Sequence, residues 1–275
     1  MKTIPFWKMS GAGNDFIVLD GRDRAVGRLG KDFMRKVCQR SLSVGGDGVI
    51  VLFPSERYDF QVRFFNPDGS RSRFCGNGSR CASRYAYLNG MAGRKLRFRG
   101  DDGVHEAVVQ GDRVSVSIPG FRNYRSVASV HAAGRKWHGA IMDIGVPHFV
   151  TEAEDIETLD LYLYGRALRH HKSFEPAGTN VNFIRFERDC AVTIRSFERG
   201  VERETLSCGS GCIAAAIHAA LTKNVRSPVK LYTRSTVDLR VFFRRKDQEI
   251  RDIFLEGDAR IIHKGEICPE ALSGF

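Results

Sequence analysis

Two short motifs of cysteine and glycine, lying nearly half a chain length apart, carry the residues best suited to chemistry. The first is CGNG at residues 75–78 and the second is CGSG at residues 208–211. Each precedes a helix-like segment, at residues 79–88 and 212–221 respectively. Because the first turn of a helix offers unpaired backbone N–H groups and the positive end of its dipole, a cysteine there is favoured as a thiolate. The two motifs therefore predict a pair of acid/base thiols.

A pair of opposed thiols suits racemisation or epimerisation at a carbon next to a carboxylate. One thiolate removes the Cα proton from one face, while the other thiol delivers a proton to the opposite face. The backbone N–H groups of both motifs would stabilise the charge that develops on the carboxylate. The sequence contains no pyridoxal-lysine motif and no flavin fingerprint, so we predict a reaction that needs no cofactor.

Other interpretations of the seven cysteines stay open at this point. A zinc site would need close ligand pairs with histidine partners, whereas the spacings here are Cys-x5-Cys and Cys-x3-Cys, and we predict no metal. A redox pair would normally show Cys-x-x-Cys, which is absent. Burial in the core suits Cys38, Cys190 and Cys268. An odd number of cysteines argues against a complete disulfide framework.

The composition indicates a soluble globular protein. The chain has 275 residues, of which 42% are hydrophobic and 27% are charged. It shows neither a signal-peptide core nor an uncharged run near the ~20 residues that span a bilayer, so we expect a cytoplasmic protein without a membrane partner. The net charge is +11, but the basic clusters at residues 94–99 and 244–246 come without a nucleic-acid-binding signature, and no nucleic-acid partner is predicted.

Both halves of the chain repeat one order of predicted elements: strand, helix, two strands, cysteine helix and further strands. In the first half these elements lie at residues 15–20, 31–39, 49–53, 58–66, 79–88, 96–98, 106–110 and 114–118. In the second half they lie at residues 148–150, where a strand is expected to end, 159–170, 181–185, 191–197, 212–221, 229–232, 239–243 and 253–255. The cysteine helix at 212–221 is apolar nearly all round, which predicts burial on every side.

This repetition predicts an α+β fold of two pseudo-symmetric domains. Each domain would be a mostly antiparallel β roll or barrel around a central buried helix. The first domain would span residues 1–119 and carry Cys75, and the second would span residues 120–275 and carry Cys208. This prediction includes the possibility that the last strand of the chain packs against the first domain.

With these motifs established, the chain resembles the diaminopimelate epimerase family over almost its whole length. The segments that carry the resemblance are residues 8–16, 66–70, 75–81, 145–150, 178–183, 198–200 and 208–211. The resemblance implies a cofactor-independent isomerase that interconverts LL- and meso-diaminopimelate in lysine and peptidoglycan synthesis. It also implies a small amino acid as the partner and a homodimer as the assembly.

The resemblance further assigns roles to single residues. It makes Cys75 and Cys208 the acid/base thiols, with His148 and Glu198 beside them to orient the reacting Cα and bind its amino group. The residues that would present backbone N–H groups to the reacting carboxylate are Gly76, Asn77, Gly209 and Ser210. The residues that would contact the amino acid through side chains are Asn14, Asn66, Asn180 and Arg199, with Arg199 forming a charged fork to the distal carboxylate.

Some positions depart from the family pattern. Val146 stands where the family often carries Asn, Gly48 where some members carry Gln, and Ser210 where Thr is common. The Val146 change removes a polar contact from the region that would recognise the distal end of the substrate. Because related thiol racemases act on other amino acids, including histidine, the alternative is a racemase of another amino acid with the same two-cysteine mechanism.

Overall fold

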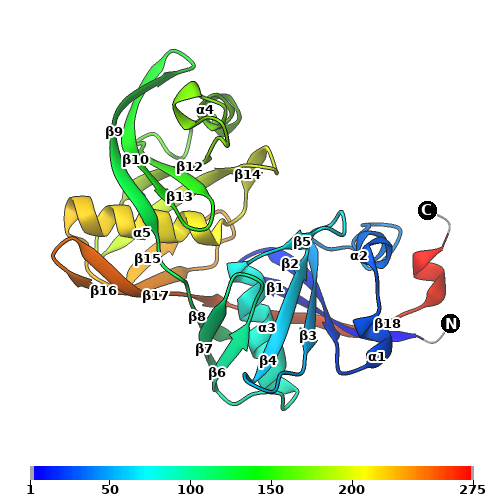
Figure 1. Ribbon diagram of the computed structural model, residues 1–275. Helices are drawn as coiled ribbons and strands as arrows, with labels where there is room; N and C mark the ends of the chain where they lie inside the picture. The colour runs from blue at the N-terminus through cyan, green and yellow to red at the C-terminus, as the bar shows by residue number, and fades with distance from the viewer. Residues whose placement is uncertain (1–2, 274–275) are drawn as a thin grey trace. The chain divides into compact units, whose positions relative to one another are not determined.

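The computed structural model describes residues 3–273. The chain divides into two compact units, Met1–Ser117 with Gly257–Phe275 (unit 1) and Ile118–Glu256 (unit 2). Strands make up most of both units, with a few helices packed on them (Figure 1). The predicted α+β class is therefore confirmed. No helix within residues 3–273 is both long and apolar enough to cross a bilayer.

The described part of unit 1 is built from strands, two short α-helices, one long α-helix and a short 3-10 helix. Its elements are β1 (Ile4–Gly11), β2 (Asn14–Asp20), α1 (Arg24–Gly27), α2 (Lys31–Val37), β3 (Gly48–Phe53), β4 (Phe60–Phe65), β5 (Arg71–Ser72), α3 (Gly76–Leu88), β6 (Lys95–Arg99), β7 (Val104–Gln110), β8 (Arg113–Ser117), β18 (Arg260–Ile267) and η2 (Pro269–Leu272). Strands β2 and β3 pair in parallel, as do β4 and β6, while β3 pairs antiparallel with β4. Strand β18 returns to pair antiparallel with β1.

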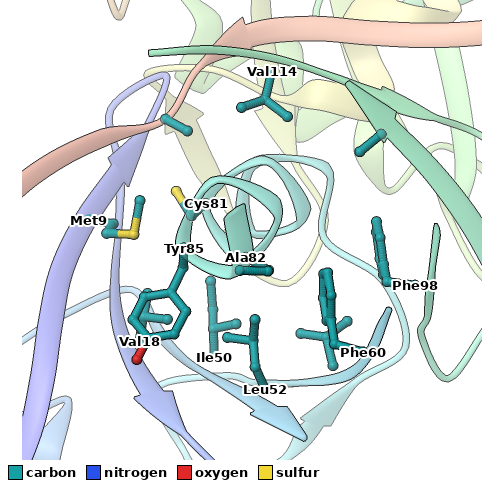
Figure 2. Close-up of a cluster of buried hydrophobic side chains, with 14 of the residues drawn as sticks. Met9, Val18, Ile50, Leu52, Phe60, Cys81, Ala82, Tyr85, Phe98 and Val114 are labelled. Carbon is teal, nitrogen blue, oxygen red and sulfur yellow. The ribbon is translucent and has the colours of Figure 1, made fainter. Parts of the chain in front are cut away.

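Helix α3 lies in the core of unit 1 with strands around it (Figure 2). Its buried face uses small side chains such as Cys81 and Ala82, which let the strands approach closely, together with the larger Tyr85. The strand residues labelled around it are Met9, Val18, Ile50, Leu52, Phe60, Phe98 and Val114. A helix enclosed in this way has its N-terminus fixed by tertiary packing as well as by its own hydrogen bonds.

Unit 2 follows a similar order. Its elements are β9 (Arg122–Ala132), β10 (Arg135–Asp143), β11 (Pro147–Glu152), α4 (Leu161–Arg169), η1 (Lys172–Phe174), β12 (Asn180–Phe186), β13 (Ala191–Glu198), β14 (Arg203–Thr205), α5 (Gly209–Lys223), β15 (Val229–Tyr232), β16 (Leu239–Lys246) and β17 (Glu249–Asp258), whose last two residues belong to unit 1. Strands β11 and β12 pair in parallel, as do β13 and β15, while β12 pairs antiparallel with β13.

Helix α5 is buried from Gly211 to Ala220, as its apolar composition predicts. Alanine side chains dominate this segment, so neighbouring strands pack close to the helix backbone. The helix ends where Asn224 adopts a left-handed conformation, with φ of 53°, a common way to stop a helix.

Several predicted boundaries are wrong. Both cysteine helices begin at the residue after the cysteine, at Gly76 and Gly209, although glycine-rich sequence has low helix propensity. Residues 148–150 lie in the interior of β11, which continues to Glu152, rather than at the end of a strand. The β9–β10 hairpin was not predicted, because its Arg, Ser and Ala residues weaken the alternation by which a strand is recognised.

Candidate active site

Cys75 occupies the N-cap position of α3. Its backbone is extended, with φ of −144° and ψ of 111°, and its Sγ accepts a hydrogen bond from the backbone N–H of Gly78 at 3.3 Å. Gly76 and Asn77 form the first turn beside it. Because a hydrogen bond donated to sulfur and the positive end of the helix both favour negative charge, this setting suits a thiolate.

The side chain of Asn77 supports the first turn of α3 from within unit 1. Its Oδ1 accepts a hydrogen bond from Nη2 of the buried Arg80 at 2.9 Å, and Nε of Arg80 donates to the backbone oxygen of Asp258 at 3.1 Å. A carboxylate oxygen of Asp258 accepts from the backbone N–H of Ala12 at 2.7 Å. Because the side-chain oxygen of Asn77 accepts from Arg80, the backbone N–H is the group of Asn77 that is predicted to contact the ligand.

Asn14 and Asn66 lie at separate turns of unit 1. Asn14 is the first residue of β2, and its Nδ2 donates to Oδ2 of Asp47 at 2.7 Å. Asn66 follows β4, is exposed, and donates through Nδ2 to Oγ of Ser70 at 3.0 Å. The described contact of Asn66 is thus within its own turn, whereas that of Asn14 joins the start of β2 to the segment before β3.

Cys208 occupies the N-cap position of α5, with φ of −105° and ψ of 107°, beside Gly209 and Ser210 of the first turn. It is buried, with its Sγ 3.6 Å from Oγ of Ser210. Burial, and next the charge of Glu198, raise the pKa of the Cys208 thiol well above its usual value. This sulfur is therefore held in the protonated form.

Glu198 is the partner of that thiol. It ends β13, where burial raises the pKa of its carboxyl, and hydrogen bonds from Thr205 and from Cys208 partly offset the rise. The Cys208 thiol thus donates to a carboxylate. Each sulfur also accepts from a backbone N–H of its helix, that of Gly78 for Cys75 and that of Gly211 for Cys208, so the difference between them is the Glu198 carboxylate. The two cysteines share a helical position and differ in protonation setting.

His148 is fully buried on β11, directly opposite Asn180 of β12 in the strand register. Burial, and next the nearby charge of Arg199, lower the pKa of its imidazole to about 3, so the ring is neutral at physiological pH. Its Nδ1 lies 3.2 Å from Nδ2 of Asn182. Its Nε2 is buried and finds no hydrogen-bond partner within residues 3–273. Because such orphaned polar atoms are rare, this atom marks a position for a ligand group.

Asn180 and Arg199 meet at the same end of unit 2. Nδ2 of Asn180 donates to the backbone oxygen of Pro147 at 3.2 Å, and its Oδ1 accepts from the backbone N–H of Arg199 at 2.9 Å. The guanidinium of Arg199 donates to the backbone oxygen of Ala177 at 3.2 Å. The predicted residues of this half are thereby linked to one another through β11, β12 and the turn after β13.

Three residues of unit 2 that the sequence did not single out contact the predicted ones, directly or through one another. Thr205 of β14 donates to Glu198, and Asn182 of β12 lies beside His148, while Ser196 of β13 reaches His148 only through its hydrogen bond to Asn182. A buried strand carrying two asparagines, at residues 180 and 182, was the available signal. Within residues 3–273, no group of three or more His, Cys, Asp or Glu side chains is arranged to hold a metal ion.

Comparison with known proteins gives relatives of nearly the same length. The family model described as diaminopimelate epimerase matches residues 6–118 and 140–259. The chain is 40% identical over 282 residues to the diaminopimelate epimerase of Aquifex aeolicus (strain VF5), a match that covers 98% of this chain and 99% of that relative. It is 38% identical over 263 residues to the diaminopimelate epimerase of Chlorobaculum tepidum, with 94% and 99% covered.

Solved structures similar to this fold have much lower sequence identity. A phenazine biosynthesis protein of the PhzF family from Bacillus anthracis is 14% identical with a TM-score of 0.74, and the match covers 98% of this chain and all of that one. A hydroxyproline epimerase from Agrobacterium vitis is 14% identical with a TM-score of 0.67, with 98% and 93% covered. These two likenesses concern the fold.

Proposed function

Because this chain belongs to the diaminopimelate epimerase family and is an amino-acid epimerase, we propose that it interconverts LL- and meso-diaminopimelate by a two-cysteine mechanism without a cofactor. The observation that carries the proposal is the pair of N-cap cysteines, each with a backbone N–H donating to its sulfur, of which Cys208 in addition faces the Glu198 carboxylate. Sγ of Cys75 accepts from the N–H of Gly78, and the Cys208 thiol donates to Glu198. One base and one acid are what a single proton exchange requires.

In the proposed reaction the Cys75 thiolate takes the Cα proton from one face of the substrate. The Cys208 thiol gives its own proton to the opposite face, which leaves a Cys75 thiol and a Cys208 thiolate. The charge that develops on the reacting carboxylate is met by backbone N–H groups of Gly76, Asn77, Gly209 and Ser210. The reverse reaction exchanges the roles of the two sulfurs.

The remaining site residues would bind the rest of the amino acid. Glu198 and His148 orient the reacting Cα, with the Glu198 carboxylate accepting from the amino group. The side chains proposed to contact the substrate elsewhere are Asn14, Asn66, Asn180 and Arg199. Arg199 would bind the distal carboxylate through its guanidinium, which forms no ion pair with another residue among 3–273.

We also propose that two pseudo-symmetric domains, residues 1–119 and 120–275 with the last strand added to the first, supply the two thiols. The strand pairings support this proposal. In unit 1 the order is β2 parallel to β3, β3 antiparallel to β4, and β4 parallel to β6. In unit 2 it is β11 parallel to β12, β12 antiparallel to β13, and β13 parallel to β15. In unit 1 the short strand β5 is followed by Cys75, the N-cap of α3. In unit 2 the short strand β14 is followed by Cys208, the N-cap of α5.

We propose that the protein is a homodimer in the cytoplasm and that it acts in lysine and peptidoglycan biosynthesis, as the family resemblance implies. Light scattering during gel filtration tests the assembly. A single peak at twice the chain mass is expected, and a peak at one chain mass at micromolar concentration would contradict it.

The test of the reaction is solvent deuterium uptake at Cα, read by mass spectrometry, with reduced enzyme in D2O. The panel contains LL-diaminopimelate, histidine, proline and glutamate. We expect exchange in diaminopimelate alone. Exchange confined to another amino acid would replace the substrate and keep the thiol chemistry, whereas no exchange in any of them would contradict the mechanism.

The thiol assignment predicts that Cys75→Ser and Cys208→Ser each lower the epimerisation rate by at least ~10²-fold, because each removes one of the two proton positions. Circular dichroism should show both variants folded. The matched control is Cys268→Ser, which should leave the rate unchanged. This thiol is exposed and that of Cys190 is only half-buried, so the expected core burial is correct for Cys38 alone of the three. Near-normal turnover in either catalytic variant would overturn the two-base proposal.

A further inference from the structure

A line of buried polar side chains runs from β13 to β11 in unit 2. Oγ of Ser196 donates to Oδ1 of Asn182 at 2.9 Å. Nδ2 of Asn182 lies 3.2 Å from the backbone oxygen of Phe149 and 3.2 Å from Nδ1 of His148. Ser196 is 4% exposed, and Asn182 and His148 are fully buried. Because buried polar atoms are nearly always hydrogen-bonded, the partners just named indicate which atom donates and which accepts.

The orientation of the Asn182 amide follows from its partners. A backbone carbonyl oxygen only accepts, so the amide atom facing Phe149 must be the NH2 group. That group has two hydrogens, and the second points to the other near neighbour, Nδ1 of His148. The amide oxygen is left to accept from Ser196. All the polar atoms of Asn182 are then satisfied in one arrangement.

The state of His148 follows in turn. A ring nitrogen that accepts a hydrogen bond carries no proton, so Nδ1 is unprotonated. A neutral imidazole then carries its single proton on Nε2. This is the buried ring atom that finds no partner among the described residues.

The corresponding positions of unit 1 show that the fold does not need these polar groups. Asn182 faces Ser196 in the β12–β13 register and Val150 in the β11–β12 register. In unit 1, Ile50 faces Phe64 in the β3–β4 register and Val18 in the β2–β3 register. All three of those side chains are buried hydrocarbons of one core cluster. Hydrocarbons thus fill these positions of unit 1, so the same strand order does not require polar groups there, and their presence in unit 2 is consistent with a role at His148.

We propose that Asn182 is a positioning residue that fixes His148 in the tautomer with its proton on Nε2, making the ring a hydrogen-bond donor to an anionic acceptor on the substrate, the reacting carboxylate. This inference rests on the proposed function, since it takes His148 to face the substrate. It refines that proposal: a donor at Nε2 does not accept from the amino group, which is left to Glu198.

The direct test is nitrogen NMR on wild-type protein labelled with ¹⁵N-histidine, with the His148 signals assigned by their loss in His148→Gln. We expect an Nδ1 resonance of the unprotonated type and an Nε2 resonance of the protonated type at neutral pH. A protonated Nδ1 would overturn the inference, and this readout requires no Asn182 variant to fold.

Two variants then test the role of Asn182. In Asn182→Asp a carboxylate replaces the donor, so the proton should move to Nδ1 and kcat should fall ~10- to 10²-fold, with a smaller change in KM. Asn182→Leu should leave both tautomers populated. The control is Asn123→Asp, the same change at an exposed residue of unit 2, which should alter neither the His148 signals nor kcat. An unchanged His148 tautomer in folded Asn182→Asp would contradict the inference.

Failure of the inference and failure of the proposed function are separable. If wild-type protein exchanges deuterium into diaminopimelate but shows a protonated Nδ1, the Asn182 inference falls and the function stands. If wild-type protein shows the expected tautomer but exchanges no deuterium, the function falls and the tautomer assignment stands.

Discussion

At the scale of single residues, the two cysteines differ in the group that faces each sulfur. A backbone N–H donates to each sulfur, but Cys208 in addition faces the carboxylate of Glu198, which after burial is the next largest cause of its raised pKa. A neutral amide at position 198 would remove that charge. The pKa of Cys208 depends on Glu198 in a way that an alkylation experiment can measure.

Glu198→Gln is therefore expected to lower the pKa of Cys208 and to move the pH profile of its alkylation by iodoacetamide to lower pH. The measurement is the alkylation rate of each cysteine-containing peptide by mass spectrometry. The exposed Cys268 serves as an internal reference whose profile should not move. An unshifted Cys208 profile, or a shift to higher pH, would mean that the Glu198 charge does not act on this thiol.

Residue types and spacing revealed only part of the site. The thiols and their glycine turns could be predicted because a cysteine followed by glycines before an apolar run has a local physical meaning. His148, Glu198 and Arg199 were proposed from the family resemblance, since only strand pairings between distant segments bring them near one another. Asn182 was missed because its hydrogen bonds depend on which strand lies beside β12, and this is decided by tertiary structure.

At the scale of elements, the close approach of α5 to β12 depends on one glycine. A Cβ on Gly211 would lie 2.3 Å from Oδ1 of Asn182 and 3.2 Å from the Cβ of Cys208. The same helical position in α3 is Gly78, where a Cβ would lie 3.0 Å from the ring of Phe64. An aromatic ring can shift by a few tenths of an ångström, whereas Asn182 is held by hydrogen bonds on both sides.

We expect Gly211→Ala to lower the free energy of unfolding by about 1–3 kcal/mol through overpacking, a loss larger than the ~1 kcal/mol that alanine adds to a helix. Gly78→Ala should lower it less. Urea unfolding of both variants, followed by fluorescence, makes the comparison. Equal stability of the two variants, or a more stable Gly211→Ala, would show that α5 and β12 are less tightly packed than the structure has them.

Element existence was easier to predict than element boundaries. Strands such as β4 and β8 alternate clearly and were found, because one face of each is more deeply buried than the other. The β9–β10 hairpin turns through Ala133 and Gly134, both at positive φ, with only Gly134 giving a sequence signal. Both helix starts were placed three residues late because the N-cap cysteines hold glycine-rich turns that propensity alone would exclude.

At the scale of the whole molecule, two buried histidines couple stability to pH. Burial, and next nearby positive charge, lower the pKa of His148 to about 3 and of His218 to about 4, both below the ordinary value of 6.5. Since the unfolded chain then binds protons more readily, their stabilising effect is complete above about pH 6.5 and is lost as the pH falls toward 4 and 3.

The free energy of unfolding is therefore expected to fall between about pH 7 and pH 5, and His218→Gln should reduce that slope. Urea titrations at several pH values measure it, and His138→Gln, the same change at an exposed residue of unit 2, is the control. The free energy of unfolding should change less with pH in His218→Gln than in His138→Gln. An equal or larger change with pH in His218→Gln would contradict the buried neutral state of His218.

Because the chain returns to unit 1 at Gly257, the two units complete their folding in a fixed order during synthesis. On the ribosome, unit 2 is contiguous and complete once Glu256 has emerged, whereas β1 must wait for β18, its antiparallel partner 249 or more positions downstream of Ile4–Gly11. Nascent domains usually mature from the N-terminus onward, but here the segment made first finishes assembling after the one made second. During that interval an unpaired edge of β1 is exposed to other chains, so the speed of synthesis and the availability of chaperones would influence the yield of active enzyme.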